Sequence, residues 1–197
     1  MKFKTLVEEK KKELRSENIR DVQQAAVNNE EWLCDKIDNH LERFGDTLSE
    51  TKEDVLVKIQ NDLMVASLFA KDPSKQNVSE KMVAELLDIE KLPAGGANSV
   101  RFNKEGELVS QNTPDASKSA DFLYNGIYLT QKYTRVCGGA QDNQRDDVIT
   151  FLENGSLGGY KVGALVDGEY WDNNADYIKE YFKDNDAVSV LSMDDLI

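Results

Sequence analysis

The sequence Ser119-Ala-Asp-Phe-Leu-Tyr-Asn-Gly-Ile-Tyr-Leu-Thr-Gln-Lys-Tyr133 places Asn125-Gly126 between two β-rich runs. An Asn-Gly pair in this setting is the strongest short signal for a type I′ hairpin, because both residues tolerate a positive φ. The turn fixes the strand register, so that Asp121 lies opposite Thr130 and Lys132 lies diagonal to Asp121 on the same face. The sequence therefore predicts that these three polar side chains converge on one small site.

An aspartate that opens one strand, a hairpin, and a second strand ending in acid-x-lysine resemble the core of the PD-(D/E)XK nucleases, the restriction-endonuclease-like superfamily. The resemblance implies that Asp121 binds Mg²⁺ together with the backbone carbonyl of Gln131. It also implies that Lys132 positions the attacking water or stabilises developing charge. Thr130 departs from the family pattern, since it occupies the position of the second acid and hydroxyls coordinate Mg²⁺ less well than carboxylates. This departure fits an inactive subunit, an engineered variant or a second acid supplied from elsewhere.

The segment 77–90 predicts a helix with Asn77 as its N-cap. Its apolar stripe is predicted to consist of Val78, Met82, Leu86 and Ile89. The resemblance implies that a glutamate of this helix faces the metal, with Glu80 as the first candidate and Glu85 as the second. Glu80 also lies three residues after Asn77, where it would complete a capping box. Both interpretations of Glu80 stay open on the sequence.

Residues 141–152 predict a further helix, 160–167 predict a buried strand and 187–191 predict a final strand. The resulting order of helix, hairpin, helix, strand, helix and strand is similar to the core of the nuclease family. We therefore expect an α/β fold over residues 72–197, a restriction-endonuclease-like domain with a mixed central sheet flanked by helices. The connection before the hairpin is rich in loops, with short strands expected near 100–102 and 108–109.

Several basic and amide residues follow the hairpin and are predicted to contact DNA. They are Arg135, Gln141, Asn143, Gln144 and Arg145. Helix N-termini attract anions, and Asn and Gln side chains can read adenine, so these residues suit phosphate and base contacts. The alternative is that they form the solvated start of a helix and contact no nucleic acid.

Residues 1–71 are predicted to form an N-terminal helical region that ends near Asp72-Pro73. A helix break is expected at Gly45-Asp46-Thr47, with a new helix start within 49–53. The apolar repeat of Val55, Ile59 and Leu63 is typical of a bundle core or a dimer surface.

Composition excludes several classes of function. The chain of 197 residues has one histidine, His40, so a Ser-His-Asp hydrolase and a histidine-rich metal site are disfavoured. Cys34 and Cys137 are too few for a disulfide framework and are expected to be reduced. The sequence has neither a phosphate-binding GxxxxGK loop nor an apolar run near the about 20 residues that a membrane helix needs. We expect a soluble, cytoplasmic protein with no membrane partner.

The function that the resemblance implies is a Mg²⁺-dependent endonuclease acting on double-stranded DNA, of the site-specific type II restriction kind. A homodimer or a separate recognition subunit is the expected assembly. The net charge of −13 is the main objection, because phosphate contacts normally require a basic surface. The alternative is a non-catalytic acidic regulatory or assembly module on a nuclease-like scaffold.

Overall fold

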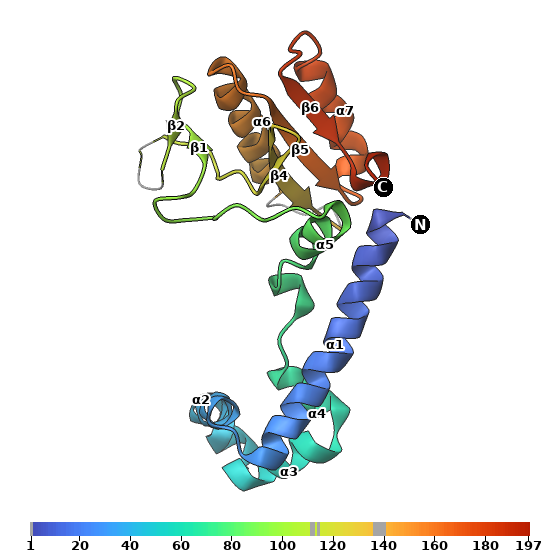
Figure 1. Ribbon diagram of the computed structural model, residues 1–197. Helices are drawn as coiled ribbons and strands as arrows, with labels where there is room; N and C mark the ends of the chain where they lie inside the picture. Colours follow the sequence, from blue (N-terminus) through green and yellow to red (C-terminus); the bar gives the residue numbers. More distant parts are fainter. Residues whose placement is uncertain (1, 111–112, 114, 136–140) are drawn as a thin grey trace. The chain divides into compact units, whose positions relative to one another are not determined.

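The computed structural model divides into two compact units (Figure 1). The first, here called the helical unit, is Val7–Val78, and the second, the sheet unit, combines residues 2–6 with Ser79–Ile197. The division falls after Val78, whereas the sequence indicated Asp72-Pro73. Pro73 begins a short 3-10 helix that belongs to the helical unit. The residues described are 2–110, 113, 115–135 and 141–197.

Long helices dominate the first part of the chain. Their bounds are α1 Phe3–Asn28, α2 Glu31–Leu48, α3 Lys52–Asn61, α4 Leu63–Phe69 and the 3-10 helix η1 Pro73–Lys75. The predicted helix start within 49–53 is confirmed, since Thr51 caps α3 by accepting a hydrogen bond from the Asp54 amide at 3.2 Å. Apolar side chains of the four α-helices form one core, made of Val22, Ala25, Ala26, Leu33, Ile37, Val55, Leu56, Ile59, Ala66 and Phe69.

One local prediction for the helical unit is wrong. Gly45 does not break a helix, because α2 continues to Leu48 and ends where Ser49 adopts a left-handed φ of 52°. A helical glycine costs about 1 kcal/mol relative to alanine, which packing elsewhere in the helix outweighs. The repeat of Val55, Ile59 and Leu63 was predicted to be a bundle core or a dimer surface; Val55 and Ile59 belong to the core, whereas Leu63 is 64% exposed. The reason is that α3 ends at Asn61 and Asp62 begins α4 as its N-cap.

The sheet unit is a mixed α/β structure. Its elements are α5 Val78–Leu87, β1 Arg101–Phe102, β2 Leu108–Val109, β3 Phe122–Tyr124, β4 Ile127–Tyr133, α6 Gln141–Leu157, β5 Val162–Asp167, α7 Trp171–Tyr181, β6 Val188–Leu191 and the 3-10 helix η2 Met193–Asp195. The main sheet has the strand order β3-β4-β5-β6, in which β3 and β4 are antiparallel and the remaining pairs are parallel. β1 and β2 form a separate antiparallel pair. The predicted α/β class, mixed sheet and order of elements are confirmed.

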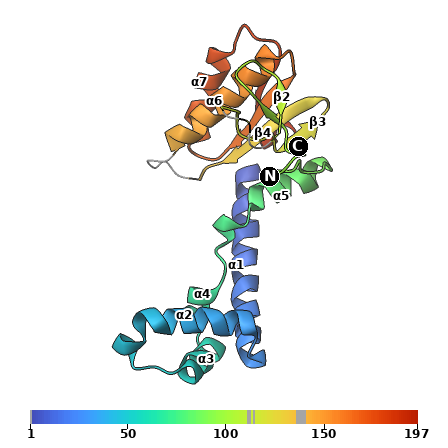
Figure 2. The same cartoon turned by 90° about the vertical axis from the view of Figure 1, so that its left-hand side faces the viewer.

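One face of the sheet is covered by α6 and α7 (Figure 2). Alternate residues of β5 supply its part of this core, because successive strand residues point to opposite faces. The buried residues of the layer are Phe102, Ala120, Val148, Phe151, Leu152, Val162, Ala164, Val166, Tyr170, Trp171 and Ile178. On the other face, the Phe3 ring meets the Tyr133 ring edge-on at 6.4 Å between centroids.

The helix before the hairpin is shorter and turned differently from the prediction. It begins at Val78 after Asn77, whose φ of 51° is left-handed rather than the extended conformation typical of an N-cap. Val83 is fully buried, whereas Leu86, predicted to be in the apolar stripe, is 44% exposed. The buried side of α5 therefore combines Val78, which the predicted stripe included and which is 3% exposed, with Val83, which the stripe omitted.

Candidate functional site at the end of the hairpin

The hairpin has the predicted turn and register. Asn125 and Gly126 have φ values of 50° and 79°, as a type I′ turn requires, and Phe122 pairs with Leu129. β3 begins at Phe122. Asp121 directly precedes it, and the Asp121 backbone amide donates to the Leu129 carbonyl at 2.7 Å. The hairpin thus holds Asp121 beside β4 at the point where β3 begins.

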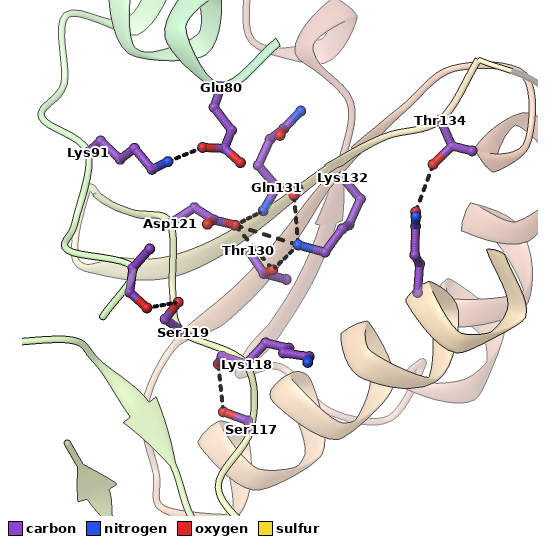
Figure 3. Close-up of polar contacts among 12 residues, drawn as sticks. Glu80, Lys91, Ser117, Lys118, Ser119, Asp121, Thr130, Gln131, Lys132 and Thr134 are labelled. Atoms are coloured by element: carbon purple, nitrogen blue, oxygen red, sulfur yellow. Dashed lines mark hydrogen bonds and ion pairs between the residues drawn. The ribbon is translucent and has the colours of Figure 1, made fainter. Parts of the chain in front are cut away.

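The Asp121 carboxylate continues the hydrogen bonding that β3 no longer supplies. Its Oδ2 accepts a hydrogen bond from the backbone amide of Gln131 at 2.7 Å and a longer one from the Thr130 hydroxyl at 3.4 Å (Figure 3). Both acceptor and donors are buried, since Asp121 is 8% exposed, Thr130 1% and Gln131 3%. A structural role is therefore established for this aspartate, whatever its chemistry.

Lys132 completes the convergence that the register predicted. Its Nζ lies 3.8 Å from Asp121 Oδ2, donates to the Gln131 carbonyl at 3.0 Å and approaches Thr130 Oγ1 at 3.4 Å. Phe122 and Leu129 are fully buried on the opposite face of the hairpin, as the alternation requires. The site thus combines a carboxylate, an ammonium group, a hydroxyl and a main-chain carbonyl.

Glu80 reaches the same site from α5 and is paired with Lys91 (Figure 3). Its carboxylate therefore binds a lysine instead of completing the capping box with Asn77. Lys91 is itself fixed beside the hairpin, because it forms an isolated antiparallel bridge with Phe122. Sequence reasoning missed Lys91, since no periodicity or motif links it to a hairpin so far along the chain.

The electrostatics of the site are those of a nearly balanced cluster. Burial raises the pKa of Asp121, and the charge of Glu80 adds to that rise. Lys132, the Gln131 amide and Lys91 oppose the rise by favouring the ionised carboxylate. Two carboxylates and two ammonium groups thus share the end of the hairpin, so that the charges of one kind compensate those of the other.

The oxygen atoms at this site fit a Mg²⁺ ion that has few protein ligands. Asp121 receives its hydrogen bonds at Oδ2, which leaves Oδ1 for a ligand, and the Gln131 carbonyl and the Glu80 carboxylate offer further hard oxygens. Mg²⁺ is commonly held by one or two carboxylates and keeps several waters. Within the described ranges no group of three or more His, Cys, Asp or Glu residues is arranged to hold a metal. Thr130 supplies a hydroxyl where a third carboxylate would stand.

The residues predicted to contact DNA are not gathered into a basic surface. Arg145 lies 3.9 Å from Asp142 and 3.6 Å from Asp146, and its guanidinium carbon is 5.5 Å from the Tyr177 ring centre. Gln144 accepts a hydrogen bond from Thr134 at 2.9 Å. The start of α6 therefore carries its positive charge already paired with acids.

Two of the other residues predicted to contact DNA, Asn143 and Arg135, are exposed. Outside the described residues lie the side chain of Gln141 and the residues Cys137, Gly138 and Gly139.

No helix within the described ranges is both long and apolar enough to cross a membrane.

A second buried carboxylate lies at the carboxyl end of β5. Asp167 is 8% exposed, and both of its oxygens accept from the Met193 amide at 3.2 Å. Burial raises the pKa of Asp167 to about 7, with the nearby acids Asp194, Asp195 and Asp172 contributing to the rise. The sequence marked 160–167 only as a strand, because a strand pattern does not reveal which polar end becomes buried.

Comparisons of the chain with models of known protein families, with curated proteins and with solved structures gave no match.

Proposed function

We propose that this chain is a Mg²⁺-dependent endonuclease that hydrolyses phosphodiester bonds in double-stranded DNA at the end of the β3–β4 hairpin. The observation that carries the proposal is the convergence of Asp121, the Gln131 carbonyl and Lys132, with Nζ 3.8 Å from Asp121 Oδ2. A carboxylate and a carbonyl suit a hard cation, and an adjacent ammonium group suits a phosphate. The restriction-type fold and a site-specific reaction are part of this proposal.

In this mechanism Asp121, the Gln131 carbonyl and Glu80 would hold Mg²⁺. When bound, Mg²⁺ polarises the scissile phosphate and lowers the pKa of a bound water. Lys132 contributes a fixed positive charge, because its ammonium group is already oriented by the Gln131 carbonyl. It can therefore orient the attacking water or stabilise negative charge that develops on the phosphate.

Glu80 can take this role without losing Lys91. Lys91 contacts only Oε2 of the Glu80 carboxylate, which leaves Oε1 for a cation. The ammonium group of Lys91 would then add positive charge beside the bound phosphate.

The test is a plasmid-nicking assay with purified wild-type protein and the Asp121→Asn variant, each with and without Mg²⁺ or Mn²⁺. Asparagine keeps an oxygen that can accept from the Gln131 amide, so the fold is retained while the metal-binding charge is lost. The matched control is Asp115→Asn, which removes a carboxylate from an exposed ion pair with Lys104. We expect metal-dependent nicking by wild type and the control, and its loss in Asp121→Asn.

The second candidate is a non-catalytic acidic regulatory or assembly module. Two observations favour it: Thr130 stands where an acid would complete the metal site, and Arg145 is paired with Asp142 and Asp146. Absence of nicking by wild type on varied DNA, with either metal and with a partner subunit if one is found, would replace the nuclease with this module. Circular dichroism of wild type and of the variants would establish that a loss of folding does not cause the absence of nicking.

A further inference from the structure

Two cavities adjoin each other on the helical unit, well away in sequence from the hairpin site. The first has a volume of about 540 Å³ and includes Trp32 in its lining, and the second has a volume of about 310 Å³ and includes Phe44 and Leu68. Lys36 and Phe69 line both cavities. We call this double cavity the helical groove, and the two cavities are its halves.

The apolar lining of the helical groove is unusually accessible. Trp32 is 41% exposed, Phe44 51% and Leu68 71%, although large apolar side chains are normally among the most buried. Phe69 supplies the floor and is 8% exposed. The His40 ring packs between the Phe44 and Phe69 rings, with centroid distances of 5.1 Å and 5.6 Å. Aromatic surface is thus held open in both halves of the groove.

The charged lining of the groove has the opposite sign to the chain as a whole. Lys36, Arg43 and Lys71 line the two cavities with one acid, Asp21, in a protein of net charge −13. Lys36 is fixed, because its Nζ donates to the Phe69 carbonyl at 3.1 Å and lies 5.1 Å from the Trp32 ring centre. In the part of the chain that is described, neither Arg43 nor Lys71 has an acidic partner for its side-chain charge.

We propose that the helical groove binds a short acidic segment of a partner protein that carries two large apolar side chains. The two halves would each take one apolar anchor of the segment. Arg43 and Lys71 would meet carboxylates that flank those anchors, which gives the groove charge complementarity to an acidic ligand.

Two other occupants fit the observations less well. A small molecule that fills one cavity would leave the apolar side chains of the other exposed. A nucleic acid places a phosphate at every nucleotide and is bound through many cations. The groove offers three. A peptide with a few acids and two apolar anchors matches both the number of cations and the number of cavities.

The experiment is a selection of random dodecapeptides displayed on phage against the full-length chain. The most enriched peptide is then synthesised with a fluorescein label, and its affinity is measured by fluorescence anisotropy. We expect enriched sequences with net negative charge and at least two large apolar residues. Trp32 emission should shift to shorter wavelength on binding, because the indole ring becomes covered, while Trp171 is already 1% exposed and should not respond.

Variants locate the binding site. Arg43→Glu combined with Lys71→Glu should weaken binding at least about tenfold, because two attractive charges become repulsive. The matched control combines Lys12→Glu with Arg20→Glu, two exposed cations of α1 outside both cavities, and should leave the affinity within about twofold. Equal weakening by both double variants would contradict the proposal, since it would indicate attraction to the chain in general.

Other outcomes would also overturn the proposal. They are no enrichment, enrichment of neutral or basic peptides, or an enriched peptide that leaves Trp32 emission unchanged. Displacement of the peptide by a short oligothymidylate at lower concentration than by unlabelled peptide would assign the groove to nucleic acid instead. The inference does not depend on the proposed nuclease activity, because none of its residues belongs to the hairpin site.

Discussion

The hairpin site and the helical groove carry charge in opposite ways. At the hairpin, Asp121 is buried and is met by Lys132 and by the Gln131 amide. In the groove, Arg43 and Lys71 line open cavities without an acid bound to them among the described residues. A buried charge requires compensation, whereas an exposed charge is hydrated and costs little. Changes at the hairpin should therefore affect folding and chemistry, and changes in the groove should affect binding alone.

The largest effect is expected for Lys132→Ala in the nicking assay. Removal of a preorganised positive charge should slow metal-dependent cleavage about 100-fold to 1000-fold. Metal affinity measured by calorimetry should stay within about twofold or increase, because the ammonium group is no ligand and repels the cation. Loss of metal binding together with cleavage would mean that Lys132 shapes the site instead of acting on the substrate.

Thr130→Glu tests whether the missing acid can be restored. Thr130 is 1% exposed and its hydroxyl faces Asp121, so a larger, like-charged side chain should destabilise the free protein by about 2 to 4 kcal/mol. Mg²⁺ should recover part of this loss, because the new carboxylate adds a hard ligand. The measurement is urea unfolding with and without Mg²⁺, beside wild type. An equal response of both proteins to Mg²⁺ would separate Thr130 from any metal site.

Asp167 gives the expected dependence of stability on pH. The folded pKa of about 7 lies above the ordinary value of about 3.9, so the fold favours the neutral acid. This contribution to stability is complete below about pH 4 and is lost as pH rises through about 7. Asp167→Asn should therefore raise the free energy of unfolding at about pH 8, by at most about 4 kcal/mol, and flatten its change towards about pH 5. A wild-type pH profile identical to that of the variant would contradict this account.

The smallest effect is expected for Arg43→Glu on stability. Arg43 is exposed and has no ion pair with any described residue, so the substitution should change the free energy of unfolding by less than about 0.5 kcal/mol, measured by urea unfolding. The comparison with Asp121→Ala is the informative one. That variant should lose about 1 to 3 kcal/mol, because the buried Gln131 amide is left without its acceptor. Similar losses for the two variants would remove the distinction between the hairpin site and the groove.

The hairpin could be predicted from the sequence because its rule is local. Asn125-Gly126 determines the turn, the turn determines the register, and the register places Asp121, Thr130 and Lys132 on one face. Their convergence required no knowledge of the rest of the fold. The chemical role assigned to them came from a resemblance, and it stays a prediction until cleavage is measured.

Features that depend on distant parts of the chain could not be predicted in the same way. The pairing of Glu80 with Lys91 requires α5 and the following loop to return to the hairpin. The acids that pair with Arg145 lie on its own helix, three residues before it and directly after it, but such spacings do not reveal whether a side chain turns to its neighbour or to a ligand. The helical groove was missed because its lining comes from α1, α2, α4 and the residues after α4.

The Asp121 carboxylate also protects the edge of the sheet. β3 is an outer strand of only three residues, and β4 continues beyond it. Without Asp121, the Gln131 amide would become an open donor beside a carbonyl, which is the template that another chain needs to add a strand. Asp121 covers the donor and Lys132 covers the carbonyl. The same two side chains therefore act as a barrier against intermolecular strand addition, and Asp121→Ala should raise the tendency to aggregate, as measured by light scattering.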